Sequence, residues 1–170
     1  AGSGSQLHLN HPASILPGHT SRLSFAFQAP TGNGDYETEL RLESESPDSF
    51  RAIWIILDNG DVKVRKGGDI KIPGQYASGE WYQLVVDKPA WTDGLTANAA
   101  NTFDVSLYDT GNNGQLLGTV THQLGADIGN FGRAQFTLAA YSADLMTNNI
   151  FEFDHFSYIW DDAGNALPGF

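Results

Sequence analysis

Cysteine is absent from the 170 residues of the chain. Its absence excludes disulfide bonds, thiolate metal ligands and a cysteine nucleophile. A chain of this length can form one domain that buries about two-thirds of its surface without such cross-links, so the lack of cysteine does not argue against secretion. With 41% hydrophobic and 12% aromatic residues, the sequence contains enough apolar material for a core.

Positive charge is also scarce. Nine Lys and Arg residues stand against 20 Asp and Glu residues, which gives a formal net charge of −11 and a pI of about 4.5. This balance disfavours nucleic acid and anionic membranes as partners, because both attract basic surfaces. The sequence has no transmembrane run and no signal-peptide core. An acidic composition with 19 glycines and one methionine is typical of extracellular proteins, so we expect a secreted protein.

Amphipathic helices are missing as well, since no stretch free of Gly and Pro places apolar residues at helical spacing. Apolar and polar residues alternate instead, as in 21–28, 36–43 and 102–108, which is the pattern of strands with one buried face. Asn59-Gly60 lies between two apolar runs and predicts a hairpin with a type I′ turn. Ten strands are expected, near residues 6–9, 21–28, 36–43, 50–57, 61–65, 80–87, 102–108, 116–122, 134–141 and 150–160.

Short strands separated by glycine-rich turns predict an all-β fold, in which two antiparallel sheets pack as a sandwich of the jelly-roll kind. Residues 1–5 have the composition of a linker or a remnant of cloning, which leaves a single domain over residues 6–170. The longest stretches without a strand pattern are 88–101 and 67–79, and both are expected to be loops.

Three segments resemble a known fold family. Residues 79–86, Gly-Glu-Trp-Tyr-Gln-Leu-Val-Val, are similar to a strand of laminin-G-like domains, and the hairpin of residues 54–64 precedes them as it does in that family. Residues 151–156, Phe-Glu-Phe-Asp-His-Phe, resemble the family's closing strand. The set resembles the concanavalin A-like jelly rolls, which include laminin-G-like domains, legume-type lectins and many carbohydrate-binding modules. Because this fold hosts lectins, adhesins, glycosidases and lyases, the resemblance implies a fold more strongly than a ligand.

The resemblance also implies a structural calcium ion. Jelly-roll carbohydrate-binding modules often hold Ca²⁺ near the ends of the domain through carboxylate, amide and carbonyl oxygens. Asp154 matches the acid of the closing strand, and Asn33 and Asp35 are its expected partners in a glycine-rich turn.

No complete catalytic motif is present. The Glu-x-Asp-x-x-Glu strand of sandwich glucanases has no match, although residues 37–39 and 43–45 each pair two acids. Residues 37–41, Glu-Thr-Glu-Leu-Arg, resemble the Arg-x-Glu-Leu-Arg strand of sandwich alginate lyases, with Glu37 where the first Arg stands. The five histidines lack His-Glu-x-x-His spacing. A polysaccharide lyase or hydrolase therefore remains an alternative.

Sugars present apolar C–H faces and a ring of hydroxyl groups, so their sites combine exposed aromatic rings with polar or charged side chains. Trp81 is predicted to lie in the core because it begins an alternating buried strand. Trp54 is expected on the strand face opposite Ile53 and Ile55. The rings nominated for sugar contact are Trp54, Trp91 and Tyr141.

The basic residues are unevenly distributed, with seven of the nine between positions 41 and 88. Neighbouring strands could gather four of them into a basic stripe, namely Arg41, Arg51, Lys63 and Arg65. Such a stripe would suit a ligand that carries carboxylates, for example a polysaccharide containing uronic acids. The alternative is that the cations pair with acids on adjacent strands: Glu37, Glu39, Glu43, Asp58 and Asp61.

The sequence thus predicts a non-catalytic carbohydrate-binding module that recognises a polysaccharide, with an acidic glycan as one candidate. A catalytic domain in the same parent chain is the expected partner. A lyase or hydrolase on the same fold, or a laminin-G-like adhesin that binds protein, are the alternatives.

Overall fold

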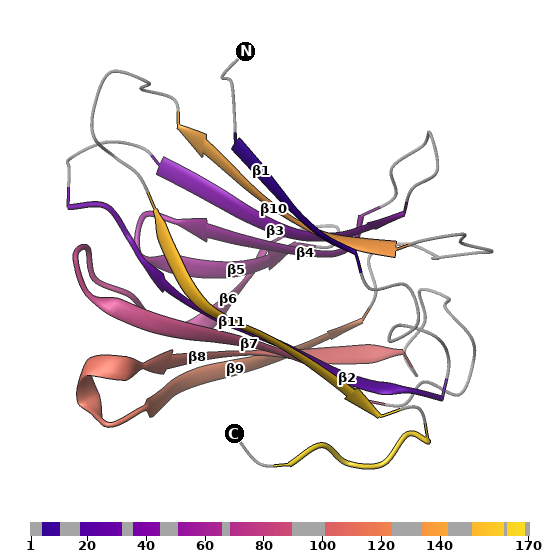
Figure 1. Cartoon of the computed structure of the whole chain (residues 1–170). Helices are drawn as coiled ribbons and strands as arrows, with labels where there is room; N and C mark the ends of the chain where they lie inside the picture. The colour runs from indigo at the N-terminus through magenta and orange to yellow at the C-terminus, as the bar shows by residue number, and fades with distance from the viewer. Residues whose placement is uncertain are drawn as a thin grey trace.

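The computed structural model describes residues 5–10, 18–31, 36–44, 51–65, 69–89, 101–123, 134–142, 151–161 and 163–168. These residues form two antiparallel sheets that pack face to face (Figure 1). The strands are β1 (Ser5–Asn10), β2 (Thr20–Gln28), β3 (Tyr36–Ser44), β4 (Arg51–Asp58), β5 (Asp61–Arg65), β6 (Asp69–Gln75), β7 (Trp81–Lys88), β8 (Thr102–Asp109), β9 (Gln115–Gln123), β10 (Ala134–Ser142) and β11 (Glu152–Asp161). One short 3₁₀ helix, η2 (Thr110–Asn112), joins β8 to β9. In this part of the chain no helix is long and apolar enough to cross a membrane.

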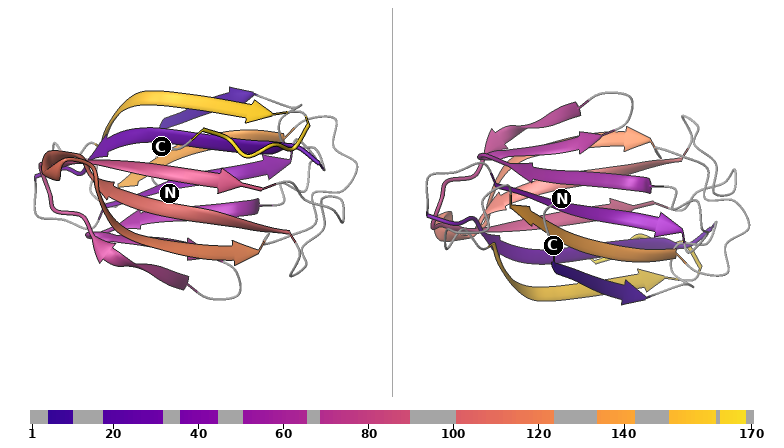
Figure 2. Two further views of the ribbon diagram at one scale, coloured as in Figure 1. Left: turned by 90° about the horizontal axis from the view of Figure 1, so that it is seen from below. Right: turned by 90° about the horizontal axis from the view of Figure 1, so that it is seen from above.

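The order of the strands shows that the chain passes repeatedly between the sheets. The six-stranded sheet has the order β1-β10-β3-β4-β5-β6, and the five-stranded sheet has the order β11-β2-β7-β8-β9. The two views of Figure 2 look at the outer face of each sheet, the five-stranded sheet on the left and the six-stranded sheet on the right. The predicted all-β, two-sheet sandwich of the jelly-roll kind is confirmed.

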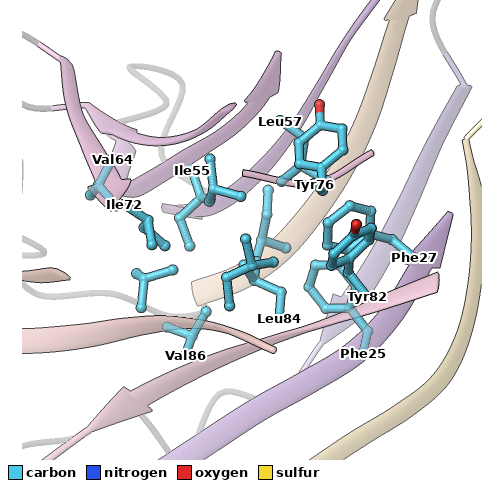
Figure 3. Close-up of a cluster of buried hydrophobic side chains, with 14 of the residues drawn as sticks. Phe25, Phe27, Ile55, Leu57, Val64, Ile72, Tyr76, Tyr82, Leu84 and Val86 are labelled. Carbon is cyan, nitrogen blue, oxygen red and sulfur yellow. The ribbon is translucent and has the colours of Figure 1, made fainter. Parts of the chain in front are cut away.

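The core lies between the sheets because the strands whose side chains the structure describes turn alternate apolar residues inward. Phe27 of β2 contacts both Phe25 of its own strand and Tyr82 of β7, with ring centroids 6.5 Å and 5.9 Å apart. The Tyr82 hydroxyl accepts a hydrogen bond of 2.9 Å from the amide of Ala77, which satisfies its polar end. Figure 3 shows these rings beside the aliphatic part of the same cluster. Each fully buried Phe, Leu or Ile contributes about 1.5–3 kcal/mol to stability.

The hairpin at Asn59-Gly60 forms as predicted. Asn59 and Gly60 have φ angles of 48° and 90°, so both central residues adopt the positive φ that a type I′ turn requires. The carbonyl of Gly60 also accepts a 2.9 Å hydrogen bond from the amide of Tyr76. This contact ties the turn to the segment that follows β6.

Two predicted boundaries were wrong. Residues 69–75, expected in a loop, form strand β6, which pairs with β5 at the edge of its sheet. An edge strand tolerates Pro73, which has no backbone N–H group, because the open side of the strand has no neighbour to accept a hydrogen bond. The strand was not predicted because Pro73-Gly74 is also typical of a loop. Ser5, assigned to a linker, is the first residue of β1.

Candidate functional site

The predicted sugar-binding residues of the central strands meet on the outer face of the six-stranded sheet. Arg41 of β3 lies opposite Trp54 of β4, and the pairing of Ile55 with Val64 brings Arg65 of β5 to the other side of Trp54. The guanidinium carbons of Arg41 and Arg65 lie 5.8 Å and 4.5 Å from the centroid of the indole ring. The side chain of Trp54 faces outward because its neighbours in β4 face the core, as predicted.

This arrangement changes the role expected of Trp54. A guanidinium group from each neighbouring strand lies over the half-buried indole ring. Cation–π contacts of this kind are worth about 0.5–2 kcal/mol each. The ring therefore contacts two arginines of the protein itself, which restricts its use as an open platform for a sugar.

Each of the four cations described on this face contacts an acid. Arg65 forms a bidentate salt bridge with Asp69, with Nε–Oδ1 and Nη2–Oδ2 distances of 2.6 Å and 3.1 Å. The other ion pairs are Arg41 with Glu39, Lys63 with Asp58, and Lys71 with Asp61. The predicted pairing of a basic residue with a named acid on an adjacent strand is confirmed for Lys63. Arg41 pairs instead with an acid of its own strand, and Arg65 pairs across strands with Asp69, an acid that the prediction did not name. We call the four pairs together with Trp54 the Trp54 patch.

The patch is not evenly open to a ligand. Arg41 was expected on the wet face of its strand, but the residue is only 8% exposed and its partner Glu39 only 4%. Lys63 and Arg65 are half-buried, whereas Lys71 is exposed. A ligand on this face would therefore contact Arg65, Lys63 and Lys71, while the buried Arg41 only packs beside the Trp54 ring.

Hydrogen bonds within the patch shift the pKa values of Asp61, Lys63 and Asp69. The hydrogen bond from the Gln75 side chain, and next that from Lys71, hold the pKa of Asp61 below its usual value. The hydrogen bond from Arg65 lowers the pKa of Asp69, and the hydrogen bond to Asp58 raises the pKa of Lys63. All of these groups are charged at neutral pH, so the patch presents a fixed array of alternating donors and acceptors.

For two other nominated residues, Arg51 and Tyr141, the structure describes the backbone pairing only. Arg51 pairs with Glu43 and Tyr141 pairs with Glu37 in the backbone register of the same sheet. Trp91 lies outside the described residues, so its predicted contact with sugar stays a prediction.

Of the three predicted calcium ligands, the structure describes only Asp154. Among the described residues, no three His, Asp or Glu side chains lie close enough to hold a metal ion. The group beside the Asp154 carboxylate is the imidazole of His155, at 3.3 Å, and Ca²⁺ takes oxygen ligands. Asn33 and Asp35 lie outside the described residues, so a joint site stays a prediction.

Trp81 was predicted to lie in the core, and this was wrong. The residues of β7 that face the core are Tyr82, Leu84 and Val86, so Trp81 and Gln83 face outward from the five-stranded sheet. Trp81 is half-buried and lines a hollow on that face. The polar residue Gln83 shares its side of the strand, and this was the signal in the sequence that could have placed Trp81 correctly.

Comparison with known proteins agrees with this architecture. No protein-family model and no curated protein sequence matches the chain. The CBM2 module of the evolved Dit protein of Lactobacillus casei BL23 phage J-1 is similar with a TM-score of 0.59 at 10% identity, over 91% of this chain and 68% of that one. Lectin II from Ulex europaeus has a TM-score of 0.58 at 10% identity, over 95% and 84% of the two chains.

An alginate lyase from Alteromonas sp. 272 has a TM-score of 0.54 at 11% identity, over 91% of this chain and 78% of that one. At such identities the likeness shows the fold alone. The chain has the jelly-roll β-sandwich fold that its sequence predicts.

Proposed function

We propose that the protein is a polysaccharide-binding module and that the Trp54 patch is its binding surface. The observation that carries this proposal is the row of ion pairs beside Trp54, which includes the bidentate salt bridge between Arg65 and Asp69. Sugar hydroxyl groups both donate and accept hydrogen bonds, so a surface that presents cations next to carboxylates can satisfy them in both directions. The fold, which is shared with a lectin and a carbohydrate-binding module, supports the same reading.

Rigidity is the physical advantage of the patch. Binding costs free energy when long side chains must be immobilised, about 0.5–1.5 kcal/mol for each. In the Trp54 patch the indole ring and the acid partners already hold Arg65 and Lys63. Much of this cost is therefore met when the protein folds.

The charge balance favours a neutral glycan over a polyuronate. Each described cation of the patch has an acid partner, so a uronate carboxylate would compete with Asp58, Asp61 and Asp69 for the same donors. A neutral polysaccharide binds without displacing them. We propose that this module acts outside the cell beside a catalytic domain, in keeping with the acidic, glycine-rich composition.

A polysaccharide lyase is the second candidate. The strand register places His8 of β1 in the same row as Arg41, with Thr137 of β10 between them. A β-elimination needs a base to remove the proton beside the uronate carboxyl group and a cation near that group. A histidine and an arginine are suitable residue types, but Arg41 is only 8% exposed and pairs with Glu39, so it would have to be uncovered to reach a uronate. An alginate lyase shares the fold.

Calorimetric titration with neutral and acidic polysaccharides tests the proposal, with a parallel assay for unsaturated products. Arg65→Lys removes the planar fork but keeps the charge, and we expect binding about tenfold weaker or worse, because a hydrogen bond from a charged group is worth about 1.5–3 kcal/mol. Arg22→Lys is the matched control, since Arg22 contacts Asp87 on the opposite sheet at the same 2.6 Å.

Equal loss in both variants, or no loss in either, contradicts the assignment of the patch. Binding that needs a uronate and weakens steeply with salt would replace the neutral glycan with an acidic one. Unsaturated products would establish the lyase, and no binding to any glycan would favour the adhesin.

A further inference from the structure

The outer face of the five-stranded sheet contains a hollow of about 560 Å³, which we call the Trp81 hollow. Its volume falls in the range of small-molecule sites, about 300–1,000 Å³. The hollow lies on the face seen in the left view of Figure 2, on the opposite side of the sandwich from the Trp54 patch. Its lining comes from β2, β7, η2 and β11, through Ala26, Trp81, Gln83, Thr110, Asp154 and His155.

A small residue in the middle of the sheet makes the floor. Ala26 of β2 lies between Asp154 of β11 and Gln83 of β7 in the strand register. Its single methyl group leaves open the space that a longer side chain would fill. Trp81 forms one wall, and the Thr110 hydroxyl donates a 2.5 Å hydrogen bond to the Trp81 carbonyl, which fixes that end of the strand against η2.

A β-bulge forms the opposite wall. Between the pairs Asp154–Ala26 and Ser157–Ser24, β11 has one more residue than β2. His155, the first of the two bulged residues, has a φ of 52°, a left-handed conformation that is uncommon for residues other than glycine. The bulge turns His155 outward, with its side chain 80% exposed, while the Phe156 ring stacks on Phe25 with centroids 5.5 Å apart.

This bulge also sets the orientation of Asp154. Its Oδ1 atom accepts a 2.7 Å hydrogen bond from the His155 amide, and Oδ2 lies 3.3 Å from the imidazole Nδ1 atom. The carboxylate is still 64% exposed, so it retains capacity to accept further hydrogen bonds. Unfavourable backbone conformations of this kind concentrate at binding sites, where the surrounding structure maintains them.

We propose that the Trp81 hollow binds one neutral pyranose residue. The apolar face of the sugar stacks on the Trp81 ring, while Asp154 accepts from its hydroxyl groups and Gln83 both donates and accepts. Among the described residues, the lining includes a carboxylate and no Lys or Arg, so an anionic sugar would be repelled. A hexose in this site and a polysaccharide on the Trp54 patch would occupy opposite faces, which would let one module contact two glycan chains.

The experiment titrates the full chain with the methyl pyranosides of glucose, galactose and mannose, and with methyl glucuronide, while tryptophan fluorescence is recorded. We expect at least one neutral glycoside to bind and the glucuronide to bind at least tenfold more weakly. Trp81→Ala should weaken binding at least tenfold, the size expected when stacking on an aromatic ring is lost. Trp81→Phe, which keeps a ring, should restore it to within about threefold.

Two further variants keep the test independent of folding. Trp160→Ala removes an exposed tryptophan of the same sheet that lies outside the hollow, and should leave the affinity unchanged. Ala26→Leu fills the floor without removing a ring and should abolish binding, with the thermal unfolding midpoint recorded for every variant.

The proposal is overturned if no glycoside binds, if the glucuronide binds best, or if folded Trp81→Ala binds like the wild type. Because Arg65→Lys changes only the Trp54 patch, glycoside binding unaffected by that variant separates the hollow from the proposed polysaccharide site. Loss of polysaccharide binding in Arg65→Lys alone would support the patch without the hollow.

Discussion

The last residue of β7, Lys88, makes the stability of the protein depend on pH. The residue is only 4% exposed, and its ammonium group donates to the carbonyl oxygens of His19 and Pro89. Burial lowers the pKa of Lys88 from its ordinary value of 10.5 to about 8. The charged form is therefore less favourable in the folded protein than in the unfolded chain.

The direction of the effect follows from which state holds the proton. Between pH 8 and pH 10.5 the unfolded chain keeps Lys88 protonated while the folded protein releases the proton. Stability rises with pH wherever the unfolded state binds more protons, so the cost of burying the charge is complete below pH 8 and is relieved as the pH rises. A change in pKa of this size gives a gain of about 2 kcal/mol between pH 7 and pH 10.

Urea unfolding of the wild type and of Lys88→Met at pH 7, 8, 9 and 10 measures this contribution. The wild type should gain about 2 kcal/mol more across the series than Lys88→Met, because the variant has no amine to titrate. Lys71→Met, which removes an exposed lysine, controls for the loss of one positive charge. Parallel curves for the wild type and Lys88→Met would refute the argument.

Two further predictions concern packing and metal binding. Gly118→Ala should lower the free energy of unfolding by about 1–3 kcal/mol, because a Cβ atom there would lie 2.9 Å from both Ile72 Cγ2 and Pro73 Cδ. The control is Gly111→Ala, whose Cβ atom would have its nearest contact at 3.4 Å and which should change the free energy of unfolding little. Equal effects of the two substitutions would contradict the close approach of β6 and β9. The calcium prediction implies that Ca²⁺ raises the thermal unfolding midpoint and that a chelator lowers it. Both changes should be smaller in Asp154→Asn than in the wild type. A midpoint that does not respond to Ca²⁺ would contradict the prediction.

Local patterns were enough to predict most of the strands. Alternation of apolar residues marks a strand because successive side chains point to opposite faces, and Asn59-Gly60 marks a turn because both residues adopt positive φ. Neighbours in a sheet depend on contacts between distant segments, and β10 therefore lies between β1 and β3 without any local signal of it. Strand β6 was missed because Pro73 and Gly74 suit an edge strand as well as a loop.

In the candidate sites, too, local patterns could be predicted from the sequence, whereas contacts between distant segments could not. The sequence placed Trp54 on the outer face correctly, yet the burial of Arg41 depends on residues from neighbouring strands. Alternation in β7 identified two sets of residues without showing which one faces the core, and Trp81 was assigned to the wrong set. The bulge at His155 comes from a mismatch between β11 and β2, which neither strand reveals alone.

Chemical-shift mapping of the isotope-labelled protein with a bound polysaccharide tests the Trp54 patch most directly. We predict that the largest changes fall on the Arg65 side-chain Nε–H group, the Trp54 indole N–H group and the backbone amides of β5 and β6, with the Arg22 Nε–H group unchanged. Binding that leaves these signals in place, or that moves Arg22 as much as Arg65, would contradict the assignment of the glycan to the outer face of the six-stranded sheet.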